Sequence, residues 1–176
     1  NAANIKRYII QNNIYGVDIE RGAVDIARLR FWLALIVDEK TPEALPNLDF
    51  KIMQGNSLLE QYNGADLSNM TEKKVGAEQS CSIFDSMLDV YRRNLRNKLS
   101  EYYSCPEHTK KVQLRKDIAD IVKQELTEQG IHIDFEDMDL SANSQFFLWH
   151  TWFHDVFSRP SKEGFDIVIG NPPYGA

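Results

Sequence analysis

The sequence predicts an α/β protein whose parallel sheet is incomplete and is interrupted by a long helical insertion. Short apolar runs that end in turn residues, typical of buried strands, occur at 14–19, 50–54 and 165–169. A helical pattern follows the first run directly, as it does in a strand–helix unit. Between the second and third runs, the pattern is mainly that of amphipathic helices.

The first 63 residues predict the α/β part of the fold. Residues 4–11 carry apolar side chains at helical spacing, and 14–19 reads as a buried strand that leads into a helix over 20–39. After a turn between two prolines, a second strand over 50–54 ends at the turn 55–57. We interpret residues 1–63 as a partial cofactor-binding segment, because ligands bind at the carboxyl ends of such strands.

Residues 64–164 predict a mainly helical insertion. Ser82 and Asp85 form a capping-box signal, and apolar residues then repeat every three or four positions as far as Tyr102. A second helical pattern runs from Pro106 to Gly130, so we expect a helical hairpin. An aromatic segment follows, which we expect to form a short helix and to pack in the core. Residues 165–176 then predict a strand and a final turn.

Composition restricts the class of protein. The chain has 176 residues, of which 43% are hydrophobic and 26% are charged. This composition is typical of a folded protein and not of a disordered tail. The net charge of -6 argues against a surface that binds nucleic acid all over, so any DNA contact is expected to be local or to lie outside this chain. No apolar stretch reaches the roughly 18 residues of a membrane span and no signal peptide precedes them, so we expect a cytoplasmic protein without membrane contact.

The final turn carries the strongest chemical signal, Asn171-Pro172-Pro173-Tyr174 directly after an apolar run. A conjugated NH2 group is a weak nucleophile because its lone pair is delocalised. The Asn171 side-chain oxygen and the Pro172 carbonyl can each accept one of its hydrogens, while the prolines fix the backbone. Tyr174 supplies a flat face for a planar substrate such as a flipped base. The alternative is a proline-rich turn in which Tyr174 only covers the core.

Two further signals follow the first and second predicted strands. Asp18 lies where doubly wound sheets bind the ribose hydroxyls of an adenosine cofactor, although it could instead cap the following helix. Asn56 and Ser57 lie where a side-chain amide could reach the adenine edge of the same cofactor, although a plain Gly-Asn turn is equally compatible.

Two weaker patterns favour structural roles. His150 and His154 are spaced like a metal pair, but no third ligand is obvious, so we expect aromatic packing and no metal site. The helical insertion also concentrates positive charge, which favours a solvated helical face over a phosphate-binding surface.

The motifs together resemble the adenine-specific DNA methyltransferases of restriction-modification systems, especially the large fused type IIG enzymes. The resemblance covers both ends of the chain, and the helical middle looks like the variable insertion of that family. It is carried by NIYGVDIERGAVDIARLRFWLAL, GNSLL, FFLWHTWFHDVF and FDIVIGNPPYG. The implied fold is a Rossmann-like class I methyltransferase sheet that lacks its first strand and its C-terminal strands.

This resemblance implies a role for each residue that matches a motif of the family. The cofactor would be S-adenosyl-L-methionine, with Asp18 on its ribose, Ile19 packed on its adenine, and Asn56 and Ser57 at the edge of that ring. The catalytic residues would hold the target adenine in duplex DNA for methyl transfer to N6, and they are Asn171, Pro172, Pro173 and Tyr174.

The resemblance also implies an incomplete domain. The family holds the methionine part of the cofactor in a glycine-rich turn, which this chain lacks before Asn4. We therefore expect a fragment that is inactive alone and contacts duplex DNA only within a longer parent. Its open sheet edges would either bring 165–169 beside 15–19 or pair with a second copy. The alternatives are methylation of a protein glutamine amide or an RNA base, and a non-catalytic assembly module.

Overall fold

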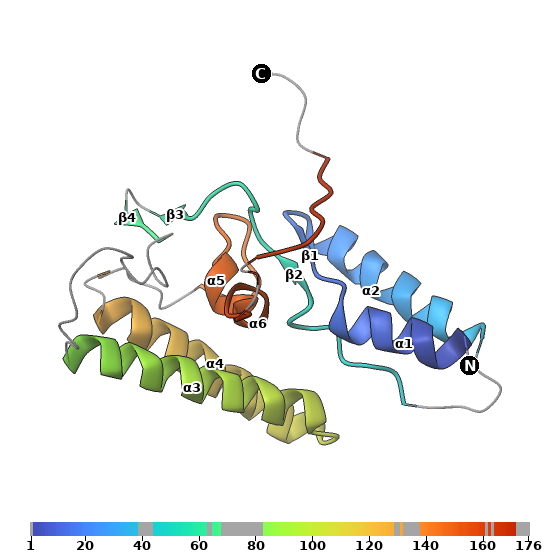
Figure 1. Ribbon diagram of the computed structural model, residues 1–176, viewed down its shortest axis with the longest axis horizontal. Coiled ribbons are helices and arrows are strands. Elements are labelled where there is room, and N and C mark those ends of the chain that lie inside the picture. The colour runs from blue at the N-terminus through green and yellow to red at the C-terminus, as the bar shows by residue number, and fades with distance from the viewer. Residues whose placement is uncertain are drawn as a thin grey trace.

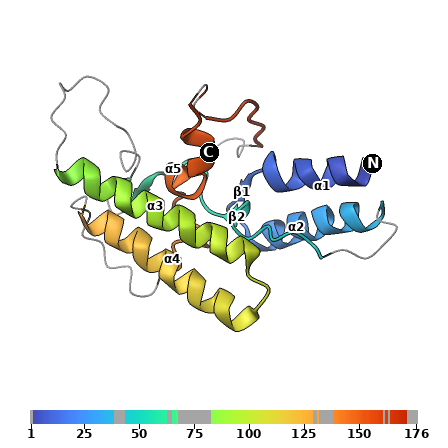
Figure 2. The ribbon, with the colours of Figure 1, turned by 60° about the horizontal axis from the view of Figure 1, so that its bottom comes forward.

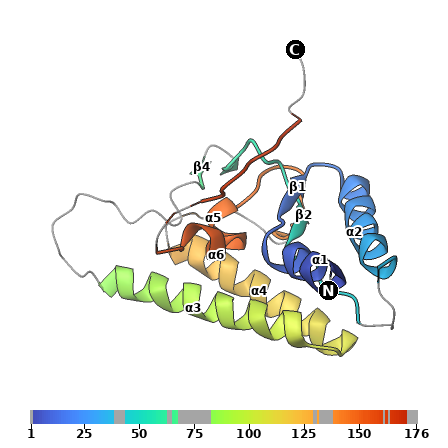
Figure 3. The ribbon, with the colours of Figure 1, turned by 45° about the vertical axis from the view of Figure 1, so that its right-hand side comes forward.

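The computed structural model describes residues 2–38, 44–62, 65–67, 83–128, 131, 138–160, 162 and 164–171. The two longest helices pack together on one side, and two further helices lie on the other side of a small sheet (Figures 1, 2 and 3). In chain order the elements are α1 Ala2–Asn12, β1 Gly16–Asp18, α2 Arg21–Ile36, β2 Ile52–Gln54, β3 Gln61–Tyr62, β4 Ala65–Asp66, α3 Ile83–Ser104, α4 His108–Glu128, α5 Trp149–Trp152 and α6 His154–Phe157.

The strands β1 and β2 form a parallel pair, as predicted, although each is shorter than its apolar run. Gly16 lies opposite Ile52, and Asp18 lies opposite Gln54. Helix α2 packs on this pair through the buried Val24 and Leu35. The Arg28 guanidinium on α2 also donates hydrogen bonds to two backbone carbonyls. Its Nε atom lies 2.9 Å from the Ile52 oxygen, and a terminal nitrogen lies 2.9 Å from the Asp49 oxygen. The strand–helix unit is therefore confirmed and is fixed by both apolar and polar contacts.

Helices α3 and α4 form the expected antiparallel hairpin (Figure 2). Its buried side chains contribute to the larger apolar core, which also contains Met53 from β2 and Phe50 from the turn before that strand. The hairpin and the sheet therefore bury apolar surface against each other. None of the described helices is both long enough and apolar enough to cross a membrane. The domain limits at 63/64 and 164/165 remain predictions.

The aromatic segment forms two short helices rather than one. The chain leaves helical geometry at Phe153, whose φ of -108° and ψ of 33° separate α5 from α6. The Phe153 ring is 1% exposed and lies against the Tyr15 and Phe147 rings at 4.9 and 5.2 Å between centroids. We attribute the break to this packing, which holds the Phe153 ring between rings from two other segments of the chain. The predicted core role of the segment is confirmed.

The predicted strand over 165–169 is wrong. Phe165 packs on the Tyr15 ring at 5.5 Å, but Ile167, Val168 and Ile169 are 78–91% exposed and no strand is assigned to them. The segment leaves the body of the molecule instead of pairing with β1 (Figures 1 and 3). An apolar run becomes a strand only when another strand supplies hydrogen-bonding partners, and none lies beside this run in the described chain. Pairing with a second copy remains a prediction.

The short hairpin of β3 and β4 was not anticipated. Gln61 pairs with Asp66, and Tyr62 pairs with Ala65, in antiparallel register. We expected the mainly helical insertion to begin at residue 64. Two residue pairs are too short to show a periodic pattern, but the dipeptide Asn63-Gly64 between the two strands is typical of two-residue hairpin loops, and sequence reasoning missed this signal.

The two glycines Gly55 and Gly22 provide a matched test of packing. A Cβ atom on Gly55 would lie 2.4 Å from Cδ2 of the buried Phe147, whereas one on Gly22 would meet nothing within 4 Å. We therefore expect Gly55→Ala to lower the free energy of unfolding by roughly 1–3 kcal/mol through overpacking. We expect Gly22→Ala to be neutral or to raise it by up to about 1 kcal/mol. Urea unfolding of both variants checks this, and equal effects would contradict it.

Candidate cofactor and catalytic site

The structure brings two of the predicted site segments together at the carboxyl ends of β1 and β2. The backbone N–H of Gly55 donates a hydrogen bond to the Asp18 carbonyl at 2.9 Å. This bond joins the last residue of β1 to the residue that follows β2. Asn56 and Ser57 follow Gly55 directly. We call the set Asp18, Ile19, Asn56 and Ser57 the carboxyl edge.

The Asp18 carboxylate is exposed at this edge. In the described part of the chain it accepts one hydrogen bond, from the backbone N–H of Glu20 at 2.8 Å. The residue that caps α2 is Glu20, whose extended backbone precedes the helix and whose side chain makes no capping bond. The alternative in which Asp18 caps the helix is therefore wrong. A carboxylate held by one bond retains lone pairs for hydroxyl donors.

Ile19 presents an apolar side chain beside this carboxylate. It is 47% exposed, and its backbone carbonyl accepts a hydrogen bond from the Gln54 side-chain amide at 3.1 Å. The position of Ile19 is thus fixed by the last residue of β2. An exposed apolar side chain beside an acceptor group can pack against a planar ring. Sequence reasoning missed Gln54, although a polar residue that ends an apolar run at a sheet edge is a usable signal.

The Asn56–Ser57 turn is fixed from two sides. The Asn56 side-chain oxygen accepts the N–H of Leu58 at 3.2 Å, and its own backbone N–H donates to the Phe146 carbonyl at 3.3 Å. The Ser57 carbonyl accepts the Trp149 indole N–H at 3.2 Å. The aromatic segment therefore does more than fill the core, because it positions this turn. Its apolar spacing predicted only the core role.

Asn171 is exposed and is the last described residue of the chain. No hydrogen bond joins it to the carboxyl edge among the described residues. Pro172, Pro173 and Tyr174 lie outside the described residues. The structure thus describes one residue of the predicted catalytic turn and does not join it to Asp18 and Asn56. The missing strand pairing of 165–169 accounts for this.

The two spaced histidines have different partners. The His154 ring nitrogen Nε2 lies 2.7 Å from an Arg96 nitrogen, and burial followed by the Arg96 charge lowers the pKa of His154. His150 packs its ring on Phe157 at 4.2 Å between centroids. In the described residues, no group of three or more potential ligands is placed to hold a metal ion.

A small parallel sheet, flanked by helices and carrying polar groups at its carboxyl edge, fits an α/β methyltransferase-like fold. The sequence model of the Eco57I restriction-modification methylase family matches residues 12–176. The chain therefore belongs to the Eco57I restriction-modification methylase family.

A relative from Methanocaldococcus jannaschii, described as a type II restriction enzyme and methyltransferase, is 26% identical over 222 aligned positions. The match covers 95% of this chain but only 18% of that relative, so the chain spans less than a fifth of the relative's length. No solved structure matches the chain.

Proposed function

We propose that this chain is part of a methyltransferase that transfers a methyl group from S-adenosyl-L-methionine to N6 of adenine in duplex DNA. The transfer would take place in the full-length protein of a restriction-modification system. The observation that carries the proposal is the backbone bond between Gly55 and Asp18, which sets the acidic residue and the amide turn side by side in a chain of this family.

The carboxyl edge fits the adenosine part of that cofactor. Asp18 offers acceptor positions to two ribose hydroxyls, because its carboxylate accepts only the Glu20 N–H among described residues. Ile19 offers a half-exposed apolar face to the adenine ring, and the fixed Asn56–Ser57 turn lies across the ladder bond from Asp18. When bound, S-adenosyl-L-methionine supplies the activated methyl group.

The final turn would act on the target base. In the proposed function the Asn171 side-chain oxygen and the Pro172 carbonyl accept the two hydrogens of an adenine NH2 group. This favours a pyramidal nitrogen whose lone pair points at the methyl donor. Tyr174 stacks on the extruded base. The turn would reach the carboxyl edge once the segment 165–169 pairs with a strand from outside this chain.

The test is a methyl-transfer assay with the full-length protein. The protein is incubated with duplex DNA and S-adenosyl-L-methionine labelled in its methyl group, and the DNA is then digested to nucleosides. We expect the label in N6-methyl-2′-deoxyadenosine from the DNA. The same incubation is repeated with RNA and with protein in place of DNA. Label only in an RNA base or a protein glutamine amide would replace this proposal with the corresponding alternative, and no transfer to any of the three acceptors would remove the enzymatic function.

The role of Asp18 is tested by Asp18→Asn in the same protein. Asparagine keeps one oxygen for the Glu20 N–H but loses the charge and the second acceptor. We expect the affinity for S-adenosyl-L-methionine to fall about 10–100-fold, the size of a lost charged hydrogen bond. Calorimetric titration measures it. Asp120→Asn, an exposed change on α4, is the control, and equal affinities of the two variants would contradict the role of Asp18.

A further inference from the structure

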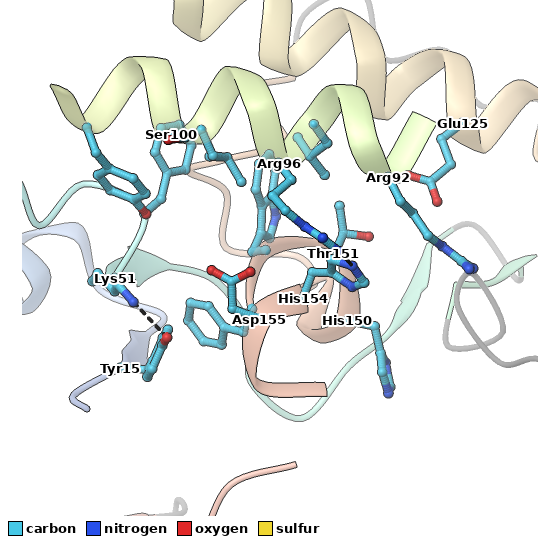
Figure 4. A pocket seen from close by; sticks show the side chains of 16 residues that line it. Tyr15, Lys51, Arg92, Arg96, Ser100, Glu125, His150, Thr151, His154 and Asp155 are labelled. Atoms are coloured by element: carbon cyan, nitrogen blue, oxygen red, sulfur yellow. Dashed lines mark hydrogen bonds between the residues drawn. The ribbon is translucent and has the colours of Figure 1, made fainter. Parts of the chain in front are cut away.

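A cavity lies at the amino ends of β1 and β2, opposite the end that carries Asp18. It is a cleft of about 330 Å³ between the sheet and helix α3, closed on one side by α5 and α6 (Figure 4). Tyr15 and Lys51 line it, and these residues directly precede β1 and β2. Because the strands are parallel, this amino-edge cleft is separated from the carboxyl edge by the strand length of about 10 Å.

The volume and walls of the cleft suit a small planar molecule. Ligand sites range from about 300 to 1,000 Å³, so this cleft accommodates a compact ligand. Its aromatic wall includes Phe50 and Trp152, whose rings stack at 5.7 Å and 25°, together with Tyr103. A ring system can pack against this wall without any change in the fold.

Two positive charges in the cleft have neutral partners. Arg96 contacts the neutral His154 ring, and the Lys51 ammonium donates to the Tyr15 hydroxyl at 2.6 Å. Burial lowers the pKa of Lys51, and the carboxylate of Asp155, which also lines the cleft, raises it by a smaller amount. An anionic group in the cleft would complete the pairing of both cations.

Two polar atoms of residues that line the cleft are deeply buried and lack hydrogen-bond partners in the described residues. The Oε1 atom of Glu125 and the indole Nε1 atom of Trp152 have none in the described part of the chain, and these side chains are 1% and 5% exposed. Each atom has less than 1 Å² of accessible surface, so it lies behind the wall of the cleft. A ligand in the cleft would contact the faces of these side chains and not these two atoms.

We propose that the amino-edge cleft binds a nucleoside 5′-monophosphate. The phosphate contacts Arg96 and Lys51, and the base packs on the aromatic wall. This site does not depend on the proposed methyl transfer, since none of its residues belongs to the carboxyl edge or to the final turn.

The test is a calorimetric titration of the full-length protein with thymidine 5′-monophosphate, whose base differs from the adenine of the proposed cofactor. We expect saturable binding that is unchanged by excess S-adenosyl-L-methionine. Arg96→Gln should weaken it about tenfold or more, because one charged hydrogen-bond partner is lost. Arg93→Gln, an exposed neighbour on α3 that does not line the cleft, should bind as the unchanged protein does.

Thymidine and inorganic phosphate, each tested alone, should also bind about tenfold more weakly or worse, because each makes only part of the contacts. Absence of binding at millimolar nucleotide would overturn the proposal. Equal affinity of Arg96→Gln and Arg93→Gln would do the same, as would displacement of the nucleotide by S-adenosyl-L-methionine. Far-ultraviolet circular dichroism of both variants verifies that they are folded.

Discussion

Asn171→Ala should lower the rate of methyl transfer to DNA by about 100- to 1,000-fold in the full-length protein. The change removes one of two oxygen acceptors from the target NH2 group, and loss of one preorganised hydrogen-bonding group at a reacting centre costs about that factor. Binding of S-adenosyl-L-methionine should be unchanged, because the proposed cofactor residues lie at the carboxyl edge. Single-turnover transfer to duplex DNA, measured beside a cofactor titration, separates the two effects.

The control for this experiment is Asn97→Ala, an exposed change on α3. It removes the same side chain at a position without a proposed contact to DNA or cofactor, so its transfer rate should match that of the unchanged protein. If Asn171→Ala were as active as Asn97→Ala, the final turn would not act on the substrate. If it lost cofactor affinity instead, Asn171 would have a different role from the one proposed.

Glu125→Gln should make the chain more stable above neutral pH. Burial raises the pKa of Glu125 from 4.5 to about 7, an effect that the Arg92 charge reduces. Below pH 4.5 the carboxyl is neutral in the folded and the unfolded chain. Between pH 4.5 and 7 the unfolded chain ionises first, so the free energy of unfolding falls by roughly 3 kcal/mol across that window. A neutral glutamine removes this loss.

Urea unfolding at pH 5 and pH 8 measures this effect. We expect the two chains to differ little at pH 5, whereas at pH 8 the Glu125→Gln variant should be more stable by roughly 2–3 kcal/mol. Glu128→Gln, an exposed change at the end of the same helix, controls for general loss of negative charge. A pH dependence that is the same in all three chains would show that Glu125 does not carry it.

Local patterns predicted those parts of the fold whose contacts are close in sequence. Helix α2 and the hairpin of α3 and α4 follow from apolar periodicity, and the pair of β1 and β2 follows from a strand–helix unit. The strand over 165–169 failed because strand formation depends on a partner, which an apolar run does not specify. The break at Phe153 was also unpredictable, since it arises from rings contributed by Tyr15 and Phe147.

The candidate site divides in the same way. Asp18 and Asn56 were predicted to lie together because both follow apolar runs, and parallel strands bring their carboxyl ends to one edge. The amino-edge cleft had no such signal. Arg96, Glu125 and Trp152 come from three separate helices and share no spacing, so only the packing of those helices reveals the cleft. The sequence showed the positive charge on α3, but it did not show which of the charged side chains line the cleft.

The two ends of the helical region return to the same place. The Phe147 N–H donates to the Leu59 carbonyl at 3.0 Å, the Trp149 N–H donates to the Glu60 carboxylate at 3.1 Å, and Ala142 bridges to Gln54. Chain added between such neighbouring anchors closes a loop at a cost that grows only slowly with its length. Loop closure therefore leaves the length of the helical region free to vary during evolution. Its core-facing side chains are not free in the same way, because they share one apolar core with Phe50 and Met53.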